Sequence, residues 1–523
     1  MDNKKIKIVS IISIIALALT LVAATYAYFV AQTSEGAQTD IKINANTVDT
    51  FTFEAGSALN LSLNQENFAS GKGNQTGTTF AKAMLSANNK TNTATEHYYL
   101  YLNISNNTFT YTQNKNTPEL LLTITDASGN AVTDITSLTY KKVTDGKGAS
   151  ISGYDITNKS GVITLFNNKE ITASPTKTDE WNITVTLVNY DKDQSNNMGK
   201  SFNAKLMIQK EEYKTTLAEY VVSQYSGTQG DNGIYYHNSS LANGAGDNSY
   251  RYAGASESVN NFICFGSTTS PCPTDNLYRI IGVFGENNHG VTGKQLVKLI
   301  KYDYATSNLL GTDGDYKDSS TPGSTYKGSL SKVDRYYWNS KATNKASNTW
   351  STSLLNKINL NTNYLNNIGT TWSNLIEDAT WKVSGHSTNF VTPSKMYTAE
   401  ITNATKTYGP SDGTSKIGLM YVSDYGFAAS PSAWTETLAN YDGNDANGTL
   451  IKTINWMYMG NYEWTISPYS SNSFSVFTLN DRGDVNNFAA GADYGSRPVL
   501  YLKASVLYAG GLGTKDSPIT LVV

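Results

Sequence analysis

Trp181-Asn-Ile-Thr-Val-Thr-Leu-Val188 is the stretch that decides the fold of the N-terminal half of the chain. Its apolar residues fall at nearly every second position, and a period of two places one set of side chains on the buried face of a strand. Three other runs alternate in the same way, at least in part: 98–104, 120–125 and 201–208. Several short strands with turn-forming residues between them predict a β-sandwich over residues 31–210.

The pattern changes beyond this region. Residues 211–233 begin with apolar residues at helical spacing and end in a Gly-rich break, which predicts a helical linker. Strand-like and helix-like runs then mix from residue 234 to residue 523, so we expect a second, mixed α/β domain. Its predicted strands are 233–236, 261–265, 277–284, 296–302, 416–422, 463–466, 473–479 and 498–502, and its predicted helices are 353–360 and 370–381. A chain of 523 residues is too long for one core, and the predicted fold class is mainly β.

Residues 1–30 form an export segment. Lys4, Lys5 and Lys7 precede a run without charged residues from 8 to 30. A signal peptide needs a basic start and a short apolar stretch, whereas a membrane span needs roughly 20 apolar residues, and this segment satisfies both patterns. Cleavage after Ala27 and retention as a membrane anchor both remain open, and either one places the rest of the chain outside the cell.

Composition limits the classes of partner. The chain has 40 Lys and Arg against 43 Asp and Glu, so it lacks the basic excess of a nucleic-acid binder. Tyr, Ser, Asn and Gly are abundant, as they are in binding loops, although they are also common on any polar surface. Cys264 and Cys272 are the only cysteines, and in an exported chain such a pair predicts one disulfide, with free thiols as the alternative.

The N-terminal region resembles the exported matrix-fibre family that includes TasA and camelysin. Leu21-Val-Ala-Ala-Thr-Tyr-Ala-Tyr-Phe29 before a β-rich domain carries the resemblance, together with residues 181–208 and their Gly199-Lys-Ser-Phe202. The resemblance implies a jelly-roll-like sandwich that assembles on the cell surface. It implies no peptidase activity here, because there is no H-E-x-x-H motif and the four histidines are isolated.

The C-terminal region resembles surface modules with a C-type-lectin-like fold, whose shape is related to the formylglycine-generating enzyme. The matching residues are Leu277-Tyr-Arg-Ile-Ile-Gly-Val283, Tyr462-Glu-Trp-Thr-Ile-Ser467 and Ser496-Arg-Pro-Val-Leu-Tyr-Leu502. The oxidase chemistry of that enzyme uses a late cysteine pair, and this chain has no cysteine after Cys272. The resemblance therefore implies the fold and not the activity.

In several proteins of this fold, the stretch before the closing strand forms the binding surface. Here that stretch is 462–495, and aromatic anchors among short polar groups are typical of recognition sites. The candidate ligand-binding residues are Tyr462, Trp464, Tyr469, Asn472, Asn480, Asp481, Asp484, Asn486, Asp493 and Tyr494. The alternative is that the apolar residues of this stretch are core and its Asn and Asp residues are ordinary turns. Arg497 and Pro498, which follow, are interpreted as structural residues, since a guanidinium can bind several loop carbonyls and proline fixes the start of a strand.

Cofactors are not expected, with calcium as the one open question. Two acidic, glycine-containing clusters could supply oxygen ligands, although such loops are more often plain turns. They are Asp313, Asp315 and Asp318, and Asp442, Asp445 and Asn447. No nucleophile elbow, Walker loop or dinucleotide motif is present, so we expect a protein that is not an enzyme.

The leading hypothesis is a surface-displayed adhesion or recognition protein. It would sit at the cell surface or be secreted, and it would bind an external protein or glycan through the late loops of its head. The alternative is an extracellular fibre subunit that assembles through the sandwich. A glycan- or peptide-cleaving enzyme is a second alternative, for which the sequence nominates no catalytic residues.

Overall fold

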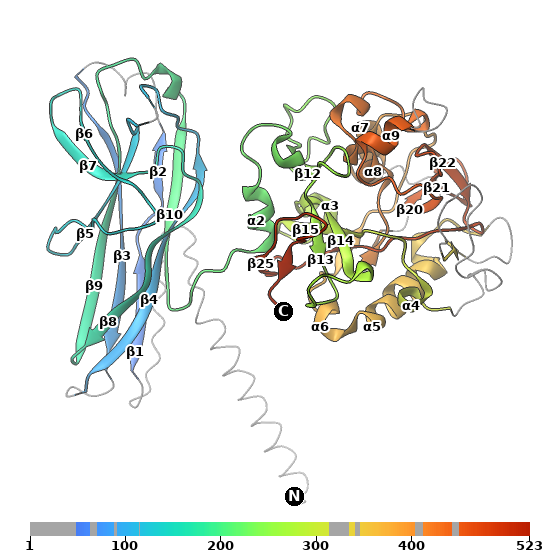
Figure 1. Cartoon of the computed structure of the whole chain (residues 1–523), viewed down its shortest axis with the longest axis horizontal. Helices are drawn as coiled ribbons and strands as arrows, with labels where there is room; N and C mark the ends of the chain where they lie inside the picture. Colours follow the sequence, from blue (N-terminus) through green and yellow to red (C-terminus); the bar gives the residue numbers. More distant parts are fainter. Residues whose placement is uncertain are drawn as a thin grey trace, which may run out of the picture. The chain divides into compact units, whose positions relative to one another are not determined.

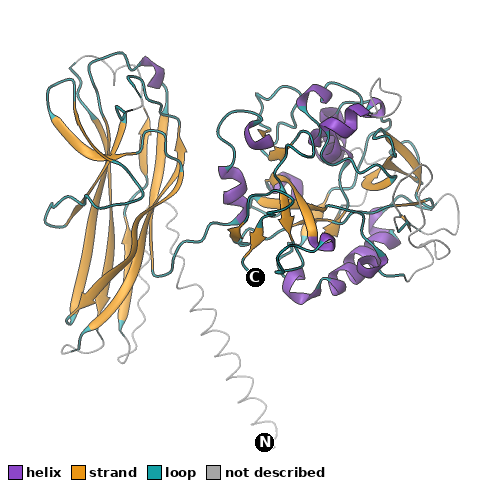
Figure 2. Ribbon diagram, viewed as in Figure 1, coloured by secondary structure: helices purple, strands orange, loops and turns teal. Residues whose placement is uncertain are grey.

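The computed structural model describes residues 49–62, 71–87, 92–114, 116–312, 334–339, 346–402, 412–441 and 449–523. The chain divides into two compact units, Met1–Tyr213 and Lys214–Val523, both built on antiparallel sheets (Figures 1 and 2), so the mainly β prediction is confirmed. The export segment with Ala27 and both acidic clusters proposed for calcium lie outside the described residues.

Two antiparallel sheets form the first unit and share one hydrophobic core. The alternation predicted around Trp181 is present, because Trp181, Ile183 and Val185 are buried while Asn182 is exposed. One sheet has the strand order β1 (Thr50–Ala55), β3 (Gln75–Ser86), β9 (Thr176–Leu187), β5 (Leu120–Asp126), β7 (Ser150–Asp155) and β6 (Tyr140–Thr144). The other has the order β2 (Leu59–Ser62), β10 (Ser201–Gln209), β4 (Ala94–Asn107) and β8 (Gly161–Ala173).

The predicted linker belongs largely to the second unit. Helix α2 (Leu217–Ser223) begins at a capping box, in which the Thr216 hydroxyl accepts from the Glu219 amide and the Glu219 carboxylate accepts from the Thr216 amide. Leu217 and Val221 are buried in the core of this unit. The amphipathic pattern therefore predicted the helix correctly. The apolar face of this helix packs into the core of the second unit, so the helix is part of that unit.

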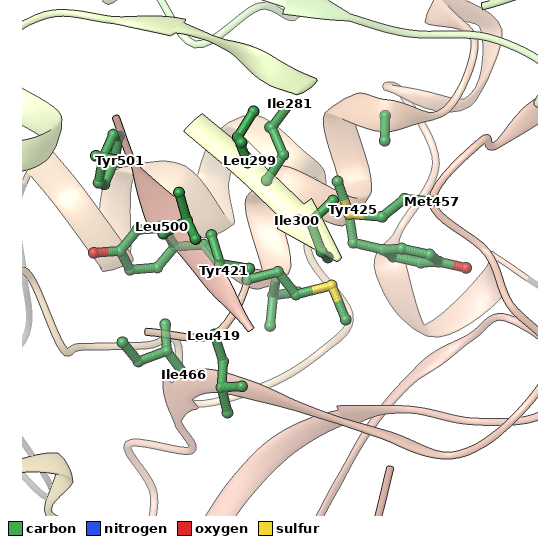
Figure 3. Close-up of a cluster of buried hydrophobic side chains, with 14 of the residues drawn as sticks. Ile281, Leu299, Ile300, Leu419, Tyr421, Tyr425, Met457, Ile466, Leu500 and Tyr501 are labelled. Atoms are coloured by element: carbon green, nitrogen blue, oxygen red, sulfur yellow. The ribbon is translucent and has the colours of Figure 1, made fainter. Parts of the chain in front are cut away.

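A seven-stranded antiparallel sheet lies at the centre of the second unit. The closing strand β24 pairs with β15, so sequences from both ends of the unit meet in one sheet. Its strands are β11 (Ile234–Tyr236), β12 (Tyr250–Tyr252), β14 (Leu277–Phe284), β15 (Leu296–Lys301), β24 (Val499–Tyr501) and β19 (Ile417–Gly418), and β13 (Phe262–Cys264) also pairs with β14. Figure 3 shows apolar side chains from this sheet packed against Leu419, Met457 and Ile466.

Smaller sheets and short helices surround this centre. The sheets pair β16 (Tyr336–Tyr337) with β23 (Asp493–Tyr494), β17 (Ala379–Trp381) with β18 (Gly413–Ser415), β25 (Tyr508–Gly510) with β26 (Thr520–Leu521), and β20 (Glu463–Pro468) with β21 (Ser475–Leu479) and β22 (Val485–Ala489). The α-helices are α3 (Glu286–His289), α4 (Ser307–Leu310), α5 (Leu365–Asn367), α6 (Gly369–Ser373), α7 (Pro393–Tyr397), α8 (Val422–Ala428) and α9 (Thr449–Ile454). Two π-helical stretches span Leu355–Tyr364 and Thr398–Thr402.

Two predicted elements were wrong in part. The helix expected over 370–381 ends with α6, because the Glu377 amide donates to the Tyr501 carbonyl and the chain then continues as strand β17. The strand expected over 416–422 is only two residues long, since helix α8 begins at Val422. In both places tertiary contacts outweigh the local apolar pattern.

Candidate recognition surface

Four of the predicted ligand-binding residues are buried, which corrects their assignment. Trp464 has no exposed surface, its indole N–H donates to the Tyr336 carbonyl at 2.7 Å, and every residue of β20 is buried. Tyr494 packs against it with ring centroids 4.8 Å apart. Asn480 and Asp484 are only 4% and 8% exposed. These four side chains belong to the interior of the second unit and are not placed to anchor an external partner.

The asparagines beside the strands act as turn residues. The Asn480 side-chain oxygen accepts from the amides of Arg482 and Gly483, which fixes the turn between β21 and β22. Asn472 does the same in the preceding loop, where its oxygen accepts from the amides of Phe474 and Ser475. Such bonds between a side chain and the backbone two or three residues later explain why Asn is common in turns. The turn interpretation therefore describes both residues.

Six candidates remain partly exposed: Tyr462, Tyr469, Asn472, Asp481, Asn486 and Asp493. The Tyr469 ring leans on the edge of the buried Phe477, 5.4 Å away. The Asp493 carboxylate lies 3.4 Å from the Arg335 guanidinium. The structure thus keeps part of the predicted set at the surface, on two strands and three loops.

An aromatic cluster forms the centre of this surface. The Tyr462 ring stacks on Tyr494 at 5.2 Å, and the Phe488 ring lies 5.8 Å from Tyr462 and 5.4 Å from Tyr494. Tyr494 is buried beneath the cluster, while Tyr462 and Phe488 are partly exposed. Asn486 lies two residues before Phe488 and therefore on the same face of β22. We call Tyr462, Asn486, Phe488 and Asp493 the late aromatic surface.

Phe390 extends the same region, although it did not stand out in the sequence. Its side chain is 66% exposed, the highest exposure of any aromatic side chain among the exposed large hydrophobic residues that the structure describes. The neighbouring Asn389 amide donates to the carbonyl of Val485, the first residue of β22, at 2.7 Å. The sequence feature that could have pointed to Phe390 is a single aromatic residue in the mostly polar stretch 384–392. Phe488, which follows Asn486 and Asn487, was not among the predicted binding residues.

Arg497 is a buried structural residue that binds two other segments of the chain. Its Nε donates to the Glu463 carboxylate at 2.7 Å, and another guanidinium nitrogen donates to the Met457 carbonyl at 2.8 Å. The carbonyl of Pro498 accepts from the Lys301 amide, which aligns the start of the closing strand. Arg497 is 2% exposed, so its contacts are made inside the protein.

Cys264 and Cys272 form the predicted disulfide, with Cα atoms 5.9 Å apart. Among the residues that the structure describes, no group of three or more His, Cys, Asp or Glu side chains could hold a metal ion. Within the same described ranges, no helix is both long and apolar enough to cross a membrane. No protein-family model and no curated protein matches the chain.

Proposed function

We propose that this chain is an exported, bacterial-type surface protein that binds an external protein or glycan through the late aromatic surface and Phe390. In this proposal the first unit is a stalk and the second is a C-type-lectin-like head. The N-terminal apolar segment would direct export and, if it is retained, would anchor the protein in the membrane.

The observation that best supports this proposal is the pair of partly exposed rings, Tyr462 and Phe488, which pack against the buried Tyr494. A ring that is fixed by its neighbours loses little conformational entropy on binding, so more of its contact energy appears as affinity. Asn486 and Asp493 add a partly exposed amide and a partly exposed carboxylate to the late aromatic surface. This combination suits a ligand with an apolar face and polar substituents, such as a sugar ring or a tyrosine-rich peptide.

An array of glycans and extracellular proteins, probed with the full chain, tests the proposal. We expect the wild-type chain to bind a defined subset of the array. Tyr462→Ala together with Phe488→Ala should weaken that binding at least about tenfold, since each ring is a candidate anchor.

Leu512→Ser provides the matched control. Leu512 is 72% exposed and lies in the hairpin that joins β25 to β26. Figure 1 shows β25 on the opposite side of the second unit from β22. This variant removes an exposed apolar side chain of the same unit and should bind like the wild type. Undiminished binding by the double ring variant would exclude the late aromatic surface as the binding site.

A further inference from the structure

A lysine and an aspartate are in direct contact deep inside the second unit. Lys298 lies on the central strand β15, and Asp424 lies on helix α8. The Lys298 Nζ atom is 2.5 Å from Asp424 Oδ2, and the two side chains are 1% and 2% exposed. The pair joins segments that are 126 residues apart in sequence. Neither group is used by the recognition surface.

Aromatic rings enclose the lysine and keep water away from it. The Nζ atom lies 4.4 Å from the centroid of the Tyr421 ring and 5.3 Å from that of Tyr501. Phe284 and Trp381 lie at 5.4 and 5.6 Å. An ammonium group has three N–H donors, yet among the described residues Asp424 is its one hydrogen-bond acceptor. Burial lowers the pKa of Lys298, which favours the neutral, nucleophilic amine.

A second carboxyl group and a guanidinium stand beside the pair. Burial raises the pKa of Glu400 to about 7, so this group can carry a proton near neutral pH. The backbone amides of Val422 and Ser423 hold its two oxygens, directly before Asp424 in the chain. An Arg251 guanidinium nitrogen lies 3.6 Å from Asp424 Oδ1, the oxygen that faces away from the lysine.

We propose that Lys298 and Asp424 condense in the folded protein to form an intramolecular amide bond. Proton transfer within the ion pair first gives a neutral amine and a neutral carboxylic acid. The amine nitrogen then attacks the Asp424 Cγ atom, the new C–N bond replaces the C–Oδ2 bond, and one molecule of water leaves.

The neighbours have distinct parts in this step. Arg251 stabilises the negative charge that develops on Oδ1 in the tetrahedral intermediate. The remaining proton on the nitrogen passes to the departing Oδ2 hydroxyl, which leaves as water. The step needs no oxidant, metal or cofactor, because condensation only exchanges a C–O bond for a C–N bond. The apolar surroundings favour the product, since they exclude the water that would hydrolyse it.

Peptide mass spectrometry of the trypsin-digested full chain tests the proposal. Trypsin cuts after Lys and Arg, but it does not cut after a lysine whose side chain is an amide. The wild-type digest should therefore contain peptide 295–301 joined to peptide 417–452, lighter than their sum by one water. Lys298→Arg and Asp424→Ala should each release the two segments as separate peptides.

Lys301 supplies the control on the same strand. Its amine is also buried, and it has no hydrogen-bond partner among the described residues. Lys301→Arg should keep the joined peptide, which then spans 295–301 with the substitution. Separate 295–298 and 417–452 peptides from folded wild-type protein would overturn the amide bond itself. A Lys298 peptide that still shows the loss of one water in Asp424→Ala would also overturn the amide bond.

Discussion

Trp464→Ala should lower the unfolding free energy of the second unit by a large fraction, because the indole is a core group. Replacing a fully buried tryptophan with alanine costs about 3–5 kcal/mol of unfolding free energy. The Tyr336 carbonyl would also lose the indole N–H that lies 2.7 Å away, which adds about 1 kcal/mol. Whole domains are stable by only about 5–15 kcal/mol, so the loss is a large fraction of the total.

Intrinsic fluorescence during urea unfolding measures this loss. Trp181 is the one tryptophan of the first unit, and the other seven of the chain's eight report on the second. Phe390→Ser is the matched control, since its ring is 66% exposed and its loss should change stability by no more than about 0.5 kcal/mol. Equal unfolding midpoints for the two variants would refute the assignment of Trp464 to the core.

Two further predictions concern buried charges. Arg497→Met should cost about 3–5 kcal/mol because it leaves the Glu463 carboxylate buried without its guanidinium, and Arg497→Met with Glu463→Leu should recover most of that loss in the same unfolding assay. Burial alone would raise the pKa of Asp247, but the Arg251 guanidinium at 2.8 Å outweighs it and holds that pKa well below its ordinary value. This stabilisation is present above about pH 4 and is lost as the pH falls, so Asp247→Asn should lower the thermal unfolding midpoint most near neutral pH. A deficit that is the same at neutral pH and at about pH 3 would contradict the Asp247 prediction, and a double variant no more stable than Arg497→Met would contradict the first.

Much of the fold could be predicted from the sequence where burial imposes a regular period. The run at 181–188 alternates because one face of β9 lies in the sandwich core, and the predicted strand at 277–284 is continuous and apolar because both faces of β14 are covered. The periodic pattern does not predict the structure where pairing with a segment distant in sequence determines it. Residues 379–381 form a strand because they pair with 413–415, and no local pattern contains that information.

The candidate surface was only partly predictable for a related reason. The resemblance to C-type-lectin-like modules drew attention to 462–495, but the sequence could not say which side of each strand faces the core. Trp464 and Tyr462 are two residues apart, yet Trp464 is buried and Tyr462 is partly exposed, because Tyr462 lies just outside β20. Phe390 joins the region through bonds of its neighbours across many residues of sequence, from the Asn389 side chain to the Val485 carbonyl and from the Ser471 hydroxyl to the Ser387 carbonyl. The contact between Lys298 and Asp424 is equally invisible in the sequence, since neither residue stands in a motif.

The most direct test of the central claim is the affinity of the full chain for an array-identified partner. The wild type and Leu512→Ser should bind with the same Kd, while Tyr462→Ala with Phe488→Ala should raise the Kd at least about tenfold. The urea unfolding curve of the double variant should show that its second unit is still folded. An unchanged Kd for the double ring variant, in a head shown to be folded, would contradict recognition through the late aromatic surface.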